Sequence, residues 1–185
     1  CQFDNRNANE GYRISAVNKY AGGIVGNGQK NSDQTVFELH IENCVSLGTV
    51  GDGKDAGGNT GGIIGRVKNE TSAYKTIINN CYFKGKIIAK GQYNAGILGD
   101  LDNGAGYCEI NNCYSEPIII YNDVVLDGRL ADVKNEEVQM YAHKNSNPII
   151  GRAVLSTGEY NTNNNYGTWS EYYSSSVHSL GFVFH

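Results

Sequence analysis

Two short elements recur in alternation along this chain, and internal repetition limits the possible folds more than any other feature of a sequence. A glycine-rich element of the form Gly-Gly-Ile-x-Gly occupies residues 21–26, 60–65 and 94–99, with a weaker copy at residues 147–151. An Ile-x-Asn-Cys element occupies residues 41–44, 78–81 and 110–113. The interval from each glycine-rich element to the next cysteine is nearly constant, which is typical of stacked structural repeats.

Each repeat is too short to bury an apolar face alone, so we expect successive repeats to stack as the turns of a solenoid. The composition agrees with short strands joined by tight corners, since 185 residues include 24 Gly and 13 Tyr but only 2 Pro. We therefore predict an all-β fold, a parallel β-helix (β-solenoid) of degenerate glycine-rich repeats, as a single domain over residues 1–185. The non-repetitive residues 122–144 are predicted to be an insertion or a cap over an open sheet edge.

The charge and hydropathy of the chain exclude two classes of partner. The net charge is −4, and the Lys and Arg residues are scattered. Without a basic stripe to pair with phosphates, nucleic acid is not an expected partner. No apolar run approaches the ~20 residues that a membrane-spanning helix needs.

The Asn-Cys elements predict columns of equivalent residues on successive turns. Each asparagine is expected at a corner, where Asn tolerates a left-handed backbone and its amide pairs with the amides above and below. Each cysteine is expected to face inward at the start of the next strand. The predicted structural ladder therefore consists of Asn43, Asn80, Asn112, Cys44, Cys81 and Cys113. The period of two along a strand then places Ser46, Phe83 and Ser115 inside the fold, and Val45, Tyr82 and Tyr114 outside it.

The first and last copies of the repeat are incomplete. Stepping from Ile149 by the usual interval reaches Tyr166, so we expect the motif to persist there with Tyr in place of Cys. Cys1 fits the same frame, as the cysteine of a repeat whose first half is missing. A mature bacterial lipoprotein also begins with a lipid-bearing Cys, and both interpretations of Cys1 stay open. Because the sequence starts without Met or a signal peptide, we expect a processed chain or a piece of a longer one.

The five cysteines, Cys1, Cys44, Cys81, Cys108 and Cys113, form no CxxC pair and have no histidine at zinc-finger spacing. Equivalent side chains on parallel strands point the same way about 4.8 Å apart, whereas a disulfide needs Cβ atoms near ~3.8 Å. We therefore expect buried, unpaired thiols, with Cys108 and Cys113 as the one pair worth testing for a disulfide. No metal or cofactor is predicted.

Residues 61–65 (Gly-Gly-Ile-Ile-Gly), followed by residues 78–82 (Ile-Asn-Asn-Cys-Tyr) and Gly85, resemble the GLUG motif. That repeat occurs in bacterial surface and secreted proteins, including adhesin-like proteins and regions of immunoglobulin A proteases. The resemblance covers residues 20–120 well and residues 147–185 weakly, where Pro148 departs from the pattern. It implies a right-handed β-helix that serves as a surface stalk, spacer or binding module, and it transfers no catalytic residue.

The sequence lacks the catalytic motifs of two common hydrolase classes. The four histidines, His40, His143, His178 and His185, do not form a His-Glu-x-x-His motif, and no Gly-x-Ser-x-Gly elbow is present. Two acidic pairs, Asp52 with Asp55 and Asp100 with Asp102, lie in segments rich in Gly and Asn, where turn chemistry explains aspartate. The alternative is calcium binding or the paired-carboxylate catalysis of polysaccharide-cleaving β-helices.

The C-terminal aromatic residues are the best candidates for binding, because rings beside amides and hydroxyls suit sugar or protein recognition. Packing in the last turn is the alternative for this set, which comprises Tyr160, Tyr166, Trp169, Tyr172 and Tyr173. We expect a non-catalytic, extracellular repeat module of a bacterial surface or secreted protein, in adhesion or as a spacer. Its expected partners are a host glycan or protein and the adjoining domains of a longer chain. A fragment of a β-helical carbohydrate-active enzyme and an accessory domain of a large secreted protease remain the alternatives.

Overall fold

The computed structural model describes residues 1–4, 20–29, 36–52, 58–90, 93–103, 106–121, 124–126, 146–155 and 159–167. These residues form 18 strands and no helix. The predicted all-β class and the predicted parallel pairing are therefore confirmed. Nothing in this described part could cross a membrane as a long apolar helix.

The strands form four sheets, named A to D. Sheet B contains β2 (Tyr20–Gly22), β6 (Asn59–Gly61), β10 (Asn94–Ala95) and β15 (Ser146–Asn147). Sheet C contains β3 (Val25–Gln29), β7 (Ile64–Lys68), β11 (Leu98–Asn103) and β16 (Ile150–Leu155). Sheet D contains β4 (Phe37–Glu42), β8 (Tyr74–Asn79), β12 (Tyr107–Asn111) and β17 (Glu159–Asn163). Sheet A contains β1 (Gln2–Asp4), β5 (Val45–Val50), β9 (Tyr82–Ala89), β13 (Tyr114–Tyr121), β14 (Val124–Leu126) and β18 (Tyr166–Gly167).

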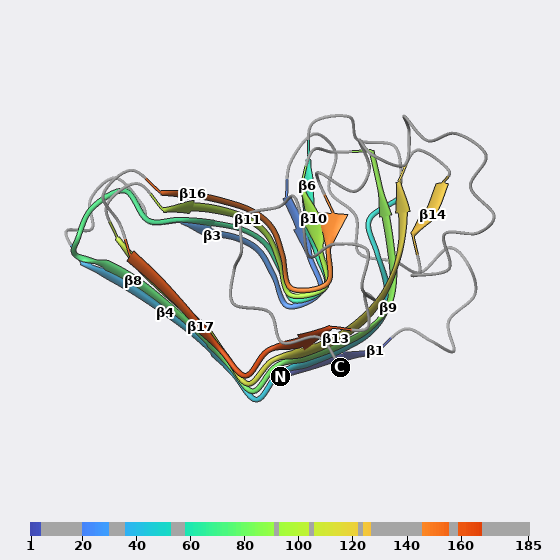
Figure 1. Cartoon of the computed structure of the whole chain (residues 1–185), viewed down its shortest axis with the longest axis horizontal. Helices are drawn as coiled ribbons and strands as arrows, with labels where there is room; N and C mark the ends of the chain where they lie inside the picture. Colours follow the sequence, from blue (N-terminus) through green and yellow to red (C-terminus); the bar gives the residue numbers. More distant parts are fainter. Residues whose placement is uncertain are drawn as a thin grey trace.

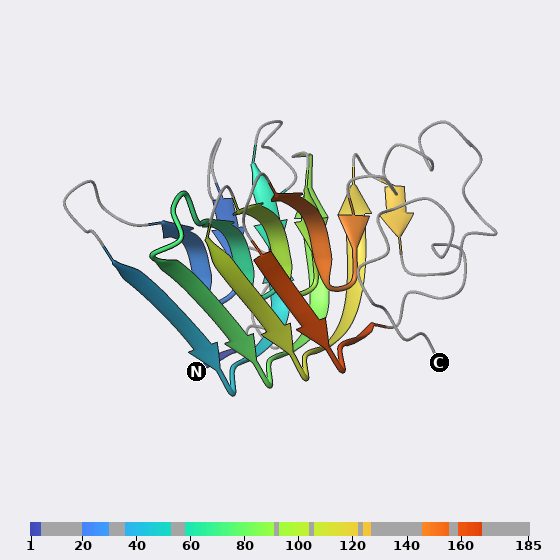
Figure 2. The ribbon, with the colours of Figure 1, turned by 60° about the vertical axis from the view of Figure 1, so that its left-hand side comes forward.

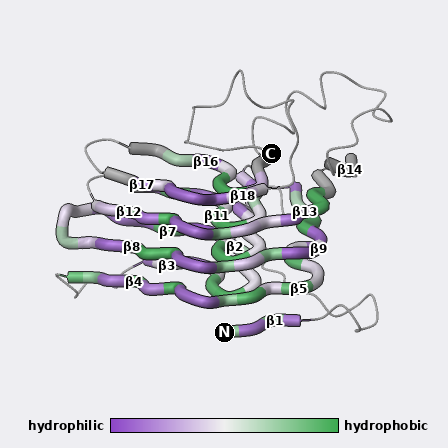
Figure 3. The backbone as a smooth tube through the Cα atoms, turned by 60° about the horizontal axis from the view of Figure 1, so that its bottom comes forward, coloured by the Kyte–Doolittle hydropathy of each residue, from purple (hydrophilic) through white to green (hydrophobic). Residues whose placement is uncertain are grey.

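The chain visits the four sheets in a fixed order, from sheet B through C and D to A, and then returns to B. We call one such passage a rung: β2–β5 form rung 1, β6–β9 rung 2, β10–β13 rung 3 and β15–β18 rung 4. Equivalent strands of neighbouring rungs pair in parallel, as in β4 with β8 and β9 with β13. Figure 3 shows the rungs one above another, and Figure 2 shows the strands of sheet D side by side.

Seen along the stacking direction, equivalent strands lie over one another (Figure 1). Sheets C and D face each other across one side of the cross-section, and sheets A and B face each other across the other side. Between them, the bend that joins sheet B to sheet C turns inward toward the start of sheet A. This inward bend turns the outer faces of sheets B and C toward each other, and we call this concave bend of the backbone the notch.

The side chains predicted to face inward form the core. Ser46, Phe83 and Ser115 are fully buried, and the isoleucines of the Asn-Cys elements are at most 4% exposed. The other buried apolar residues come from all four sheets and from the bend between sheets B and C, where Ile63, Ile97 and Ile149 are buried next to the first residue of the following strand. The inward positions predicted from the period of two after each cysteine are therefore confirmed.

Inside each rung, the glycine-rich element meets the strand that follows the Asn-Cys element, which explains the second glycine of the glycine-rich element. In rung 2, a Cβ atom on Gly62 would overlap the ring of Phe83, so only glycine lets the bend approach sheet A. Rung 4 reverses the sizes, because Pro148 replaces the glycine and a Cβ atom on the facing Gly167 would overlap the proline ring. In rung 2 a glycine faces a large ring, and in rung 4 a proline faces a glycine, so one side of this contact is small in both rungs. Dense packing of the core requires this balance of side-chain volumes.

Part of the region predicted to be an insertion or cap belongs to sheet A. β14 turns back and pairs antiparallel with the end of β13, with Ile119 opposite Leu126. β18 pairs in parallel with the beginning of β13, with Tyr114 opposite Tyr166. The two strands therefore share one edge of β13. Residues 127–145, which make up most of the predicted insertion, lie outside the described residues.

Candidate functional site

A column of tyrosines follows the outer face of sheet A at the residue after each cysteine position. Tyr82, Tyr114 and Tyr166 are register partners on rungs 2, 3 and 4. The rings of Tyr82 and Tyr114 stack with their centroids 5.5 Å apart and an angle of 18° between their planes. Because the two rings cover each other's faces, this part of the column presents ring edges outward.

A charged pair lies beside the tyrosines. Lys84 Nζ is 2.7 Å from Glu116 Oε2, and the Tyr82 hydroxyl donates to Glu116 Oε1 at 3.1 Å. The hydrogen bond from Lys84 lowers the pKa of Glu116, and burial together with Glu116 raises the pKa of Tyr82. This carboxylate is therefore held ionised by two donors from the neighbouring strand.

The outer face of sheet A also collects exposed apolar surface. Among the described residues, four large hydrophobic side chains are exposed to solvent: Val36, Tyr114, Ile118 and Tyr166. Three of them lie on β13 and β18, with Tyr114 38% and Tyr166 41% exposed. Rungs 3 and 4 of sheet A are thus the best candidate for a binding surface in the described part of the chain.

The aromatic residues predicted from the sequence are not brought together by the described structure. Tyr166 lies on sheet A, whereas Tyr160 lies in β17 of sheet D, with its backbone opposite Cys108. Trp169, Tyr172 and Tyr173 lie outside the described residues. Tyr82 and Tyr114, which complete the column with Tyr166, were predicted to point outward but not to bind.

The asparagine column occupies the corner between sheets D and A. Asn43, Asn80 and Asn112 have φ values of 53°, 53° and 51°, in the left-handed region that Asn tolerates. Asn80 Nδ2 donates to Asn43 Oδ1 at 3.3 Å, and Asn164 Nδ2 donates to Asn112 Oδ1 at 3.3 Å. The following residues, Cys44, Cys81 and Cys113, are at most 3% exposed.

The predicted replacement of Cys by Tyr166 in the last repeat is wrong by one residue. Asn164 has the left-handed φ of 52°, and Tyr166 pairs with Tyr114, so Asn165 occupies the cysteine position. Asn165 is 5% exposed, and both polar atoms of its side-chain amide bond to the backbone of rung 3. Its Oδ1 accepts from the Cys113 backbone N–H at 2.9 Å, and its Nδ2 donates to the Ile110 carbonyl at 2.7 Å.

The cysteines are all free, including the pair Cys108 and Cys113. Cys108 lies on sheet D beside Thr76, and burial raises its pKa to about 12. Cys1 is exposed, and its carbonyl accepts from the Val45 N–H at 2.9 Å, which places its backbone beside Cys44. The in-frame position predicted for Cys1 is therefore seen in the structure.

No protein-family model, curated protein or solved structure matches the chain.

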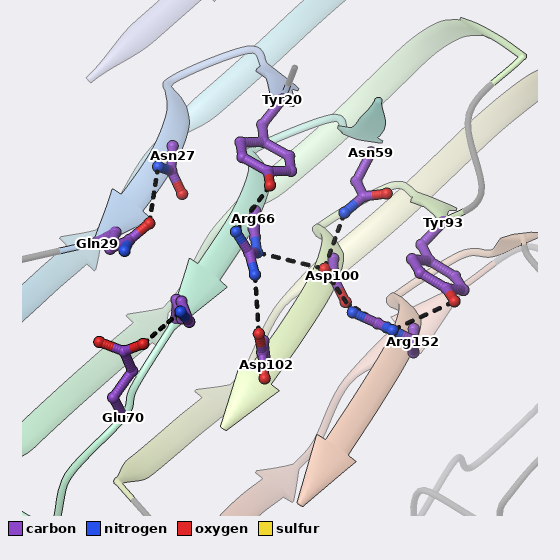
Figure 4. Close-up of polar contacts among 11 residues, drawn as sticks. Tyr20, Asn27, Gln29, Asn59, Arg66, Glu70, Tyr93, Asp100, Asp102 and Arg152 are labelled. Atoms are coloured by element: carbon purple, nitrogen blue, oxygen red, sulfur yellow. Dashed lines mark hydrogen bonds and ion pairs between the residues drawn. The ribbon is translucent and has the colours of Figure 1, made fainter. Parts of the chain in front are cut away.

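A second polar cluster lines the notch between sheets B and C (Figure 4). Arg66, Asp100 and Arg152 are register partners on rungs 2, 3 and 4. Arg152 donates from Nε to Asp100 Oδ1 at 2.6 Å and from Nη2 to Oδ2 at 2.9 Å, while Asn59 Nδ2 donates to Oδ2 at 2.8 Å. Asp100 is 1% exposed, and burial raises its pKa against the opposing effect of Arg152.

Two tyrosines cover the arginines of this notch cluster. Arg66 donates to the Tyr20 hydroxyl at 2.7 Å, with its guanidinium 4.8 Å from the ring centroid. Arg152 lies 4.0 Å from the centroid of the Tyr93 ring and donates to its hydroxyl at 3.2 Å. Since each contact joins different rungs, the notch cluster links all four rungs into one network.

The notch cluster accounts for one of the acidic pairs considered for calcium or catalysis. Asp100 is bound by Arg152, and Asp102 accepts from Arg66 Nη2 at 2.8 Å. In the other pair, Asp52 is half-buried and Asp55 lies outside the described residues. Within the described ranges, no group of three or more His, Cys, Asp and Glu side chains is placed to hold a metal ion.

Sequence reasoning missed the arginines of the notch. A signal was present, because Asn27, Arg66, Asp100 and Arg152 each follow the last glycine of a glycine-rich element. Aligning the elements would have shown that the charge alternates in sign at this position over rungs 2 to 4, as expected for side chains stacked on neighbouring strands.

Proposed function

We propose that this chain is a segment of a right-handed parallel β-helix that serves as a non-catalytic, extracellular repeat module, a spacer in a bacterial surface or secreted protein. One observation carries this proposal. The residues that define the repeat make contacts that hold the rungs together. The asparagines hydrogen-bond to each other between rungs, the cysteines are buried in the core, and the glycines leave room for the chain to bend between sheets B and C. The resemblance to the GLUG motif supports the extracellular setting.

A spacer built from repeats should tolerate the loss of one whole rung. Deleting residues 59–92 would join Gly58 to Tyr93, which is the register equivalent of Asn59. We expect this variant to keep its β-sheet circular dichroism and a cooperative, lower melting temperature, because each rung contacts only its neighbours. The matched control deletes residues 59–73, which removes β6 and β7 and breaks the order of sheets, and it should not fold.

If both deletion variants fail to fold, the result contradicts a modular spacer. Turnover assays on polysaccharides provide the second check, since the wild-type chain should show none. Measurable cleavage would favour a carbohydrate-active enzyme instead.

Adhesion is the second candidate role, and the exposed surface of sheet A favours it. Partners would contact Tyr114, Ile118 and Tyr166, where apolar groups lie next to hydroxyls and the Lys84–Glu116 pair. Binding to a glycan array and to immobilised host surface proteins should fall at least tenfold for the double variant Tyr114→Ser, Ile118→Ser. Val36→Ser is the matched control, since Val36 is 63% exposed away from sheet A. Equal binding by both variants, or none by the wild type, would count against adhesion.

A further inference from the structure

The two ends of the stack differ in how well the core residues are covered. Val25 of rung 1 is only partly buried, and so is Leu39 on the next strand. The register partners of Val25 on rungs 2 to 4 are at most 2% exposed: Ile64, Leu98 and Ile150. Rung 1 therefore leaves partly exposed apolar side chains at its end of the stack, which we call the lower end, and such surface favours contact with another element.

The lower end also carries strand edges. Among the described strands, β2, β3 and β4 each stand last in the order of their sheet. At the two ends of β4, the N–H groups of Phe37 and Asn43 donate upward to carbonyls of rung 2. Because backbone groups face the two sides of a parallel strand alternately, the residues of β4 whose groups point down are Glu38, His40 and Glu42. An edge of this kind is a template for a further strand.

Sheet A already has a strand at the level below rung 1. β1 lies beneath β5 (Figure 3) and pairs with it in parallel, with Gln2 opposite Val45. The Val45 N–H donates to the Cys1 carbonyl at 2.9 Å. The same bond joins rungs 1 and 2, where the Tyr82 N–H donates to the Cys44 carbonyl at 2.8 Å. The lower edge of rung 1 therefore accepts a parallel strand in the register that is used between rungs.

The core column that contains Phe83 indicates what a lower rung would contain. Successive register partners in this column alternate in size: Phe3, Ser46, Phe83 and Ser115. Phe83 packs against the bend of its own rung at Gly62, where a Cβ atom would overlap its ring. Phe3 occupies the equivalent position beneath rung 1 and is only partly buried against the core. Dense packing at this level therefore requires a glycine-rich bend against Phe3.

We propose that the lower end of rung 1 binds a further rung of the same glycine-rich kind, with strands parallel to β2, β3 and β4 and with β1 as its strand in sheet A. This inference rests on the proposed β-helical module and adds the place where a neighbouring rung attaches. Charge favours a rung like rung 2, because a second lysine would stack under Glu38 as Lys75 stacks above it. The Asn43 amide, whose Oδ1 accepts from Asn80 at 3.3 Å, would donate to the corner asparagine of that rung.

The test places a second copy of residues 59–80 directly before Cys1 of the full chain. This segment supplies the strands of sheets B, C and D and the corner asparagine of rung 2, and β1 completes the added rung. The melting temperature should rise by at least about 5 °C, because the lower end of the core becomes covered. Hydrogen exchange of the three downward N–H groups of β4 should slow by about tenfold or more, because they become paired.

The matched control adds residues 59–79, which omits the corner asparagine and shifts the added strands by one residue, so that their side chains face the wrong side. It should melt like the parent and leave the exchange of β4 unchanged. Equal gains for both fusions, no gain for residues 59–80, or a longer fusion that fails to fold would overturn the proposal. A chain that tolerates deletion of residues 59–92 but gains nothing from the added rung would refute the lower-end interface and leave the spacer module intact.

Discussion

The corner asparagines show why single residues matter in this fold. Asn43, Asn80, Asn112 and Asn164 hold φ values of 51–53°. This left-handed conformation costs most side chains roughly 1–2 kcal/mol, while Asn and Gly adopt it readily. The side-chain amides also form hydrogen bonds between neighbouring rungs. Asparagine therefore stabilises both the left-handed corner and the stacking of the rungs.

Two substitutions of Asn80 separate these contributions. Asn80→Gly should keep the corner and lose only the amide bond to Asn43, at a cost of about 1 kcal/mol. Asn80→Ala should lose the amide and add backbone strain, for a total of about 2 kcal/mol. The free energy of unfolding in urea measures both, and equal losses for the two variants would refute a left-handed corner at this position.

The sequence predicts the position of a single residue well where its conformational preference agrees with the alternation of side chains along a strand. The corner positions of Asn43, Asn80 and Asn112 could be predicted because few residues tolerate a positive φ and because alternation fixes the side of the next residue. Counting from Ile149 misplaces the last repeat by one residue, because the number of residues between the two elements varies from rung to rung. Aligning Asn164 with the other corner asparagines finds the register correctly.

Charged side chains on neighbouring strands form ion pairs that contribute unequally to the free energy of unfolding. In the notch cluster, Asp100 has a side chain only 2% exposed and lies between Arg66 and Arg152, with Nε–oxygen distances of 3.5 and 2.6 Å. Asp102 is 30% exposed and pairs with Arg66. Removal of a buried partner leaves charges unpaired, whereas an exposed pair contributes little.

Asp100→Asn should therefore destabilise the chain by about 2–3 kcal/mol, below the largest values for buried pairs because both arginines keep some contact with water. Asp102→Asn, the matched control, should cost less than about 1 kcal/mol. Chemical denaturation of the two variants side by side measures the difference. A loss at Asp102 as large as that at Asp100 would contradict the assigned burial and partners.

The pair between β9 and β13 should make stability depend on pH in the acid range. Lys84 and Tyr82 lower the pKa of Glu116 below its ordinary value of 4.5. The ionised Glu116 therefore stabilises the folded chain above that pH, and its contribution disappears as the pH falls through the lower, folded-state pKa. The melting-temperature difference between wild type and Glu116→Gln should shrink between pH 6 and strongly acid solution, and a difference that grows on acidification would contradict the pairing.

The notch cluster could not be predicted from the pattern of any one strand. Arg66, Asp100 and Arg152 come from three rungs, and their contacts with Tyr20 and Tyr93 depend on how closely sheets B and C approach at the bend. That approach is set by glycines whose partners lie on other rungs, as with Gly65 beside the Gly26 and Ala21 carbonyls. Alignment of the repeats predicts that Arg66, Asp100 and Arg152 stack on neighbouring strands. The distance between sheets B and C can be learned only from the three-dimensional structure.

At the scale of the whole molecule, the sequence predicts that the repeats stack on one another. It does not predict the shape of the cross-section, which depends on how the sheets pack. Recurrence of the glycine-rich and Asn-Cys elements indicates one repeat per turn. The inward bend at Gly62 depends on packing against Phe83, which lies two residues after the Asn-Cys element of the same rung. In rung 4 the large residue is Pro148 and the small one is Gly167, which shows that the glycine-rich element and the strand after the corner form one contact.

The central claim is that equivalent residues of successive repeats lie on adjacent strands, and spin labels can measure it. In the Cys1→Ser background, labels at positions 38 and 75 replace register partners on rungs 1 and 2, and labels at 38 and 107 lie on rungs 1 and 3. The first pair should be about 5 Å apart at the backbone and show strong dipolar broadening, and the second, about twice as far apart, should show weaker broadening. Absent broadening for positions 38 and 75, or stronger broadening for 38 and 107, would contradict the stacked rungs.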